Sequence, residues 1–394
     1  MENKPRSEFV YIFFLAMIAM IPAMSTDMYI AAMPTIAILW NVAESSVALS
    51  LVLWFVSFSI FLLILGPVSD KLGRRPVLLG GLCVFVVSTF LCAASANLFQ
   101  LITFRILQGA AAAAPSSMCM AICRDRYEGV KRKHTLAYIG VILSVMPMVA
   151  PMIGAFLLKY VSWRAIFGVQ GVLGAVAVFV SLGYIETLAD PVKVGIFRVL
   201  GRYINLVKNT NYMLSNKCMG LILGPFYGFI PFSTIVYIKI YGLSPQSFSL
   251  LFGLNALMSM SGAFACTRLI RFFSDIRLLT FCLAGCVTGG LGILFFGHYH
   301  YMAFSASMCL FSFSCGVSRP LSNNLILEQV STDIGSASSF IVFYQFIIGS
   351  ICMALASVSW KNPIFAFGVI AASIPAFVLI CWPLLLRRLK RINA

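Results

Sequence analysis

Long apolar runs alternate with short polar connections along the whole chain. About 20 apolar residues in a helix span a bilayer, and many of the runs reach that length. The pattern predicts twelve membrane-spanning helices and no strands. Their expected positions are 9–33, 47–68, 77–96, 98–121, 135–158, 163–186, 216–240, 248–272, 278–297, 301–326, 335–359 and 363–386.

One connection is much longer than the others. Residues 187–215 are less apolar and carry several basic side chains, and they separate six expected spans from six more. This division predicts an N-terminal bundle over 1–190, a cytoplasmic linker over 191–215 and a C-terminal bundle over 216–394. Two similar bundles place a substrate site near the midplane, at the interface between them.

Composition supports a membrane protein. The chain is 61% hydrophobic and only 10% charged, which leaves too little polar surface for a soluble protein of 394 residues. Membrane topology explains the formal net charge of +16, because most Lys and Arg residues fall on one set of connections between spans. The other set holds only Lys159, Arg164, Lys239 and Lys361. Both termini are therefore expected in the cytoplasm, and anionic lipid head groups, not nucleic acid, explain the positive charge.

The sequence contains no motif typical of a metal site, a cofactor site or an enzyme active site. The twelve Cys residues are scattered through apolar runs without a CxxC spacing, and the three His residues form no ligand set with them. The spans contain no pairing of a nucleophile with a base, and no GxxxxGK[ST] phosphate loop occurs. We expect no enzyme, no cofactor, no metal site and no ATP drive.

The stretch GPVSDKLGRRP, residues 66–76, concentrates charge between two apolar runs. Gly66 and Gly73 permit a sharp turn and a close backbone approach, while Asp70 is placed to cap a helix or to pair with an arginine. The basic side chains alone could simply fix the topology. The spacing G-x-x-x-D-K-x-G-R-R is more specific, and it resembles the signature of the major facilitator superfamily.

That resemblance implies an all-α integral membrane protein with the major facilitator fold, in which twelve helices form two six-helix bundles. It also implies a role for this loop as a cytoplasmic gate, which holds the bundles together while the transporter faces outward. Asp70 corresponds to the acidic member of the gate and Arg74 to its main basic member, and Arg75 belongs to the same motif.

Two charged residues lie inside expected spans of the first bundle. Arg105 interrupts an apolar run in LITFRILQG, and an arginine there requires a partner or water. Asp27 is the only carboxylate well inside a span, and both residues lie about 10 Å below the outer surface. We predict that they face one cavity, paired directly or through water. The alternative is an ion pair with a purely structural role.

The same segments carry a second resemblance. LITFRILQG is similar to the span 4 motif of proton-coupled members of the superfamily, which implies roles for Arg105 and Gln108. TDMYIAAMP resembles a span 1 stretch of the Bcr/CflA group of drug:proton antiporters. PMVAPMIGA, with Pro147, Pro151 and Gly154, resembles the antiporter motif of that group, although two of its glycines are alanine here. Asp27 is then the best-placed group to carry protons.

Further candidates for the substrate cavity are weaker. Arg319 in the tenth span extends to the cytoplasmic surface near Glu328, or it lines the inward half of the cavity with Asn323 and Asn324. The phenol groups of Tyr29, Tyr227 and Tyr344 need partners inside the membrane and are included for that reason.

The sequence therefore predicts a monomeric multi-pass exporter of the bacterial inner membrane, with small molecules, protons and lipids as its partners. The expected activity is export of amphipathic drugs by proton antiport. Two cavity arginines would also suit a dedicated exporter of an endogenous anionic metabolite or a siderophore, and this remains the alternative.

Overall fold

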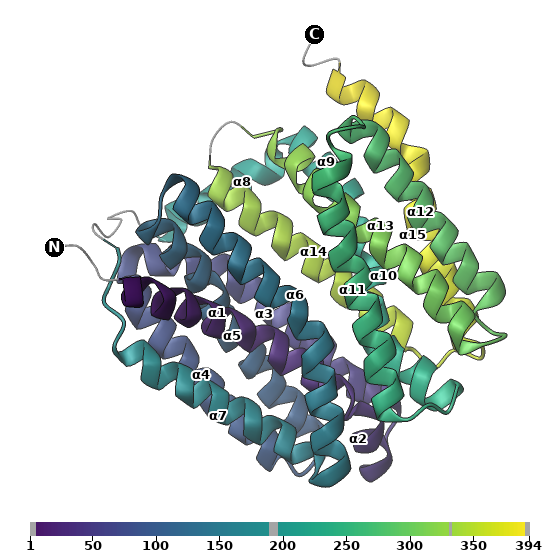
Figure 1. The fold of residues 1–394 in the computed structure, drawn as a ribbon, viewed down its shortest axis with the longest axis horizontal. Helices are drawn as coiled ribbons and strands as arrows, with labels where there is room; N and C mark the ends of the chain where they lie inside the picture. The colour runs from purple at the N-terminus through teal and green to yellow at the C-terminus, as the bar shows by residue number, and fades with distance from the viewer. Residues whose placement is uncertain (1–4, 189–195, 331–332, 391–394) are drawn as a thin grey trace. The chain divides into compact units, whose positions relative to one another are not determined.

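The computed structural model describes residues 5–188, 196–330 and 333–390, and these are almost entirely helical. Figure 1 shows the helices in chain order. Their bounds are α1 (Pro5–Ile30), α2 (Met33–Leu39), α3 (Glu44–Leu72), α4 (Arg74–Ala94), α5 (Leu98–Arg126), α6 (Gly129–Tyr160), α7 (Trp163–Leu182), α8 (Ile196–Lys208), α9 (Thr210–Leu221), α10 (Leu223–Thr234), the π-helical segment η1 (Ile235–Ile240), α11 (Pro245–Leu269), α12 (Asp275–Phe296), α13 (Tyr301–Leu327), α14 (Ile334–Ser357) and α15 (Pro363–Lys390).

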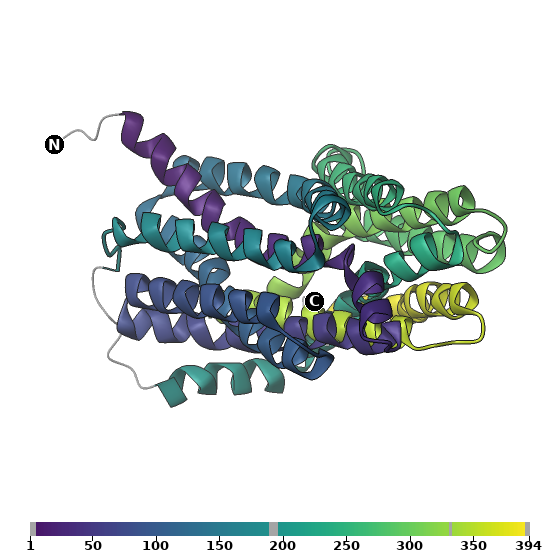
Figure 2. The same cartoon turned by 90° about the horizontal axis from the view of Figure 1, so that it is seen from below.

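Twelve segments of the described chain are long and apolar enough to cross a membrane, which confirms the number of spans predicted from the sequence. The chain divides into two compact units. One holds Met1–Val42 and Leu49–Ile196, and the other holds Ala43–Ala48 and Phe197–Ala394. In the first unit α1 contacts α5, α6 and α7, and α4 packs against α5 and α7. Figure 2 shows these helices running lengthwise beside one another.

Proline explains helix breaks within two of the predicted spans. The first span was expected to continue to residue 33, but α1 ends at Ile30 and Pro34 lies in the first turn of α2. Proline is favoured at a helix start because it lacks an N–H. The seventh span begins at Thr210 instead of 216 and consists of α9, α10 and η1. Pro225 cannot bond the carbonyl of Leu221, where α9 ends.

The stretch predicted as a linker over 191–215 contains helix. Residues 191–195 lie outside the described part of the chain, while α8 covers Ile196–Lys208 and α9 begins at Thr210. The guanidinium of Arg202 in α8 lies 3.3 Å from the Asp333 carboxylate just before α14. The ion pair joins α8 to the start of α14 within the second unit.

Glycines set the closest helix contacts. A Cβ at Gly154 of α6 would lie 2.2 Å from the Met28 carbonyl oxygen of α1. A Cβ at Gly109 of α5 would lie 2.4 Å from the Trp54 carbonyl oxygen of α3. Backbones approach this closely in membrane bundles only where small residues line the contact. The last turn of α1, which carries Asp27, is thereby held against α6.

Candidate functional site

The centre of the first unit is organised around Arg105 of α5. Its side chain is fully buried. One terminal nitrogen, Nη1, donates to the carbonyl oxygen of Ser25 at 2.9 Å and to Oε1 of Gln108 at 2.6 Å. A buried arginine is tolerated only where such acceptors replace water.

Aromatic rings enclose the same guanidinium. Its central carbon lies 4.6 Å from the centroid of Tyr29, 5.6 Å from Trp54 and 5.9 Å from Phe167. A cation facing aromatic rings within about 6 Å is stabilised by their quadrupoles. The Tyr29 hydroxyl is 2.8 Å from the Ser50 hydroxyl, so this predicted cavity residue is a buried wall of the arginine site.

A chain of amides extends from Arg105 toward α4 and α7. Gln108 donates through Nε2 to the Thr89 hydroxyl at 2.8 Å and to Oε1 of Gln170 at 3.3 Å. Gln170 donates in turn to the Met24 carbonyl of α1 at 3.2 Å. Four helices are therefore joined by one buried hydrogen-bond network that begins and ends on the last turns of α1.

Asp27 lies on that same turn but is not part of the arginine cluster. Its carboxylate accepts a hydrogen bond from the neighbouring Thr26 hydroxyl at 3.0 Å and is 7% exposed. Across the described residues, no ion pair joins it to Arg105, so the predicted direct pair does not form. Asp27 is also the only acidic side chain classed as buried in the described part of the chain.

The loop between α3 and α4 forms a second cluster. Arg74 is 2% exposed and lies between two carboxylates, with Nη1 2.6 Å from Asp70 and Nε 2.8 Å from Asp125 at the end of α5. The same Nη1 donates to the Ser69 hydroxyl. Arg75 extends the other way and donates to the Leu182 carbonyl at 2.8 Å.

Glu186 completes this cluster and was not anticipated from the sequence. It follows α7, and its carboxylate accepts the backbone N–H groups of Arg74 and Arg75 at 3.0 and 2.9 Å. It thus caps the start of α4, a role that Asp70 was one candidate to fill. Partial burial would raise the pKa of Glu186, but backbone hydrogen bonds from Leu188, Arg75, Arg74 and Thr187 outweigh it and lower the pKa.

The two glycines of the motif differ. Gly73 has a positive φ of 99°, and a Cβ there would lie 2.6 Å from the Glu186 carboxylate. Both the turn and the cap therefore require glycine at this position. Gly66 lies inside α3, and no atom lies within 4 Å of an added Cβ in the described structure. The close approach predicted at Gly66 does not occur.

The predicted antiporter residues all lie on α6. Pro147 and Pro151 are inside this helix, and Gly154 follows one turn after Pro151. Gly154 faces the backbone of Met28, the residue next to Asp27. The motif therefore positions α6 against the turn of α1 that carries the buried carboxylate.

The predicted cavity residues of the second unit lie on different helices and make separate contacts. Tyr227 of α10 is buried and its ring centroid lies 5.3 Å from that of Phe346 in α14, so it packs between these two helices. The ring of Tyr344 packs directly over Gly220 of α9. Asn323 accepts a hydrogen bond from Gln345 at 3.0 Å.

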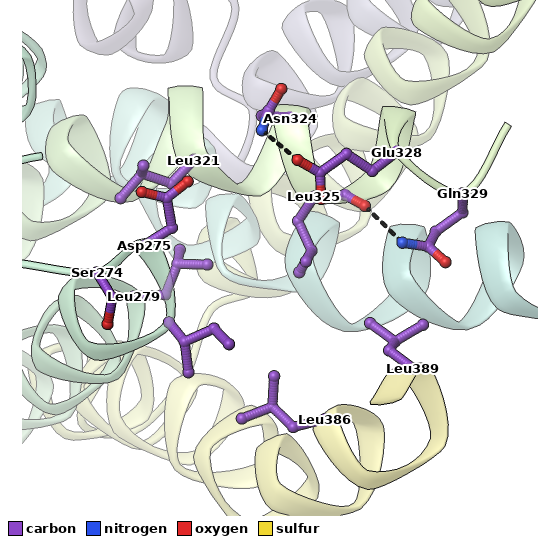
Figure 3. Close-up of a pocket in the computed structure, with 11 residues that line it drawn as sticks. Ser274, Asp275, Leu279, Leu321, Asn324, Leu325, Glu328, Gln329, Leu386 and Leu389 are labelled. Carbon is purple, nitrogen blue, oxygen red and sulfur yellow. Dashed lines mark hydrogen bonds between the residues drawn. The ribbon is translucent and has the colours of Figure 1, made fainter. Parts of the chain in front are cut away.

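Arg319 is exposed and has no ion pair with Glu328 in the described part of the chain. The Glu328 carboxylate instead accepts a hydrogen bond from Asn324 at 2.8 Å, and both residues line a pocket among α12, α13 and α15 (Figure 3). The structure therefore does not bring Arg319 together with its predicted acidic neighbour.

Two buried asparagines were missed by sequence reasoning. Asn216 of α9 and Asn255 of α11 are almost fully buried, and within the described residues their side-chain amides have no hydrogen-bond partner. Buried amides usually require partners. Asn255 is a single polar residue within an apolar run, which could have pointed to it, whereas Asn216 follows Ser215 and precedes Lys217 and has no such signal.

Comparison with known proteins identifies the class. The model of the Major Facilitator Superfamily matches residues 15–353, and the chain belongs to this family of transporters. It is therefore a multi-pass membrane transporter, with twelve candidate spans in the described part of the chain. Its family and structural neighbours are transporters, not enzymes.

Several relatives are named as resistance proteins, and one is an uncharacterized transporter. The chain is 32% identical over 356 residues to an uncharacterized MFS-type transporter, YdgK, of Bacillus subtilis (strain 168), covering 88% of each chain. It is 24% identical to a bicyclomycin resistance protein homolog of Haemophilus influenzae, covering 90% of each. It is 25% identical to multidrug resistance protein D of Escherichia coli (strain K12), covering 93% of each. These names are consistent with the Bcr/CflA-type drug transporters.

A solved structure supports the same fold. The nucleoside transporter NupG superposes with a TM-score of 0.73 at 12% identity, covering 95% of this chain and 99% of that one. The all-α major facilitator fold predicted from the sequence is confirmed.

Proposed function

We propose that this protein exports small amphipathic molecules, including drugs, across the bacterial inner membrane in exchange for protons. The observation that carries the proposal is the position of Asp27. It is the only buried carboxylate in the described chain, and it lies on the α1 turn that Arg105, Gln170 and Gly154 contact. Intramembrane carboxylates in such positions are typical of proton relays.

The separation of Asp27 from Arg105 supports this role. A carboxylate in a strong ion pair would stay ionised, whereas within the described residues the partner of the Asp27 carboxylate is the neutral Thr26 hydroxyl. Arg105 holds its charge through neutral acceptors and aromatic rings, so the proton can bind and leave without breaking a salt bridge. In this proposal Asp27 binds a proton when facing outward and releases it inward, while substrate moves out.

The drug substrate is supported by the names of the relatives, which include bicyclomycin and multidrug resistance proteins. The alternative, a dedicated exporter of an anionic metabolite or a siderophore, has less support. It required Arg105 and Arg319 to share one cavity, and Arg105 is already engaged by Gln108 and Ser25.

The test uses purified protein in liposomes with a pH-sensitive dye inside. Gradients of tetraphenylphosphonium, a neutral phenicol and a tricarboxylate are imposed in turn on wild type, Asp27→Asn and Glu128→Gln. Glu128 is an exposed carboxylate outside the site and serves as the matched control. We expect proton movement with the cation or the phenicol in wild type and in the control.

Proton movement should fall to background in Asp27→Asn. Substrate flux without proton movement, or coupled movement that survives in Asp27→Asn, would overturn the proposed antiport. Coupling to the tricarboxylate alone would replace the drug with the anionic metabolite.

A further inference from the structure

A pocket of about 580 Å³ lies among the first turns of α12 and the last turns of α13 and α15, wholly within the second unit. Figure 3 shows the side chains of Asp275 and Glu328 beside a set of leucines. The apolar lining consists of Ile276, Leu279, Leu321, Leu325, Leu386 and Leu389. The pocket therefore combines two carboxylates with a wall suited to a hydrocarbon chain.

The first unit has an arginine, Arg74, at the corresponding place beside its own carboxylates. Arg74 is the first residue of α4, and Asp275 is the first residue of α12, the third span of its own bundle. Glu328, just after α13, is as many residues from the first residue of α13 as Asp125 is from the first residue of α5. The first unit thus places a cation beside Asp125, whereas in the second unit Asp275 and Glu328 line one pocket.

The second unit supplies no internal cation in its place. Across the described residues, no Lys or Arg forms an ion pair with Asp275 or Glu328. Glu328 accepts a hydrogen bond only from the neutral Asn324 amide. Arg388, close to the pocket on α15, instead donates to the Asn211 side chain at 3.3 Å. Both carboxylates are exposed, and an external cation between them would favour their charged forms.

We propose that this pocket binds an amphiphile with an ammonium head group, whose nitrogen lies between Asp275 and Glu328 and whose chain lies along the leucines. The ligand takes the place that the Arg74 guanidinium holds in the first unit. Two sources share this chemistry: a free amphipathic cation, and the amine of a phosphatidylethanolamine lipid. The site is separate from the Asp27 turn, so this proposal does not depend on proton antiport.

The test is site-specific labelling of the full-length protein in phosphatidylglycerol nanodiscs. The probe is dodecyltrimethylammonium with a diazirine at the end of its chain, and labelled peptides are mapped by mass spectrometry. We expect labels on the α12, α13 and α15 segments that line the pocket. Unlabelled dodecyltrimethylammonium should compete, whereas dodecyl sulfate, with the same chain and the opposite charge, should not.

Variants separate the head-group site from general partitioning into the lipid. Asp275→Asn with Glu328→Gln should reduce pocket labelling by about tenfold, since each exposed charge contributes about three- to fivefold. Glu128→Gln with Asp333→Asn removes two carboxylates outside the pocket and should leave the labelling unchanged. Each protein is first checked by gel filtration and thermal unfolding.

A second variant restores the pattern of the first unit. Leu325→Arg would place a guanidinium one turn from Glu328 inside the pocket, and it should abolish labelling while raising the unfolding temperature. Equal labelling in wild type and in Asp275→Asn with Glu328→Gln, or equal competition by dodecyl sulfate, would overturn the proposal. Protection in nanodiscs that contain phosphatidylethanolamine identifies the lipid as the ligand, and its absence identifies the free cation.

Discussion

At the scale of single residues, the buried arginine is the most consequential finding. Arg105 has two hydrogen bonds from one nitrogen, but Nε and Nη2 have no hydrogen-bond partner in the described structure. Desolvating a guanidinium with incomplete compensation costs stability. A residue kept at such a cost is more readily explained by function than by folding.

We therefore predict that Arg105→Gln abolishes transport without unfolding the protein. Glutamine removes the buried charge, so the free energy of unfolding should stay the same or rise by about 1 kcal/mol. Thermal unfolding and liposome transport measured on the same preparation provide the check. Arg164→Gln, at an exposed position in the first turn of α7, is the control for removal of an arginine. A large loss of stability in Arg105→Gln would show that the cluster is structural.

Glu186 gives a prediction about pH. Its pKa is lowered in the folded protein by backbone hydrogen bonds, so the cap contributes stability above the ordinary carboxyl pKa of about 4.3. That contribution is lost as the pH falls through the lowered folded value. Glu186→Gln should cost about 0.5–1 kcal/mol at pH 7, because the group is exposed and its charge is screened.

The difference between Glu186→Gln and wild type should begin to shrink as the pH falls below about 4.3, and it should reach zero only below the lowered pKa of the folded protein, where wild type is also protonated. Unfolding temperatures in detergent across this range measure it, with Glu128→Gln as the control. A difference that stays constant with pH would rule out the charged cap.

At the scale of helices, Gly154 makes the sharpest prediction. A methyl group there would lie 2.2 Å from the Met28 carbonyl oxygen, so α6 must move away from α1. Gly154→Ala should cost about 1–3 kcal/mol, as overpacking does in other cores, and should weaken coupled transport.

Gly140→Ala on the same helix is the matched control, because among the described residues no atom lies within 4 Å of an added Cβ there. It should be neutral or stabilising by about 0.5–1 kcal/mol, since alanine favours the helix. Thermal unfolding separates the two variants, and equal effects would refute a close α1–α6 contact at Gly154.

The helices also show how far sequence could go. Span positions follow from runs of about 20 apolar residues, a local property, and all twelve were found. The cap on α4 could not be found, because Glu186 is 112 residues from Arg74 and looks like any loop acid. The break at Ile30 was missed since hydropathy continues across it, and only Pro34 marked the end. The absence of a direct Asp27–Arg105 pair depends on side-chain directions, which spacing does not set.

At the scale of the whole molecule, the distribution of basic residues predicts an even number of crossings with both ends inside the cell. Single cysteines introduced into a cysteine-free background test this directly. Ala96→Cys, between α4 and α5, should react with an impermeant maleimide in intact cells. Glu128→Cys, between α5 and α6, should react only after the membrane is opened. The reverse pattern would invert the topology and with it the proposed direction of transport.

The single buried carboxylate has an electrical consequence. If Asp27 carries one proton per cycle, exchange for a monovalent cation moves no net charge, and transport should not respond to membrane voltage. Exchange for a neutral drug moves one elementary charge, and a potential of 100 mV then adds about 2.3 kcal/mol to the driving force. The same protein would be electrically silent with one drug and would generate a current with another.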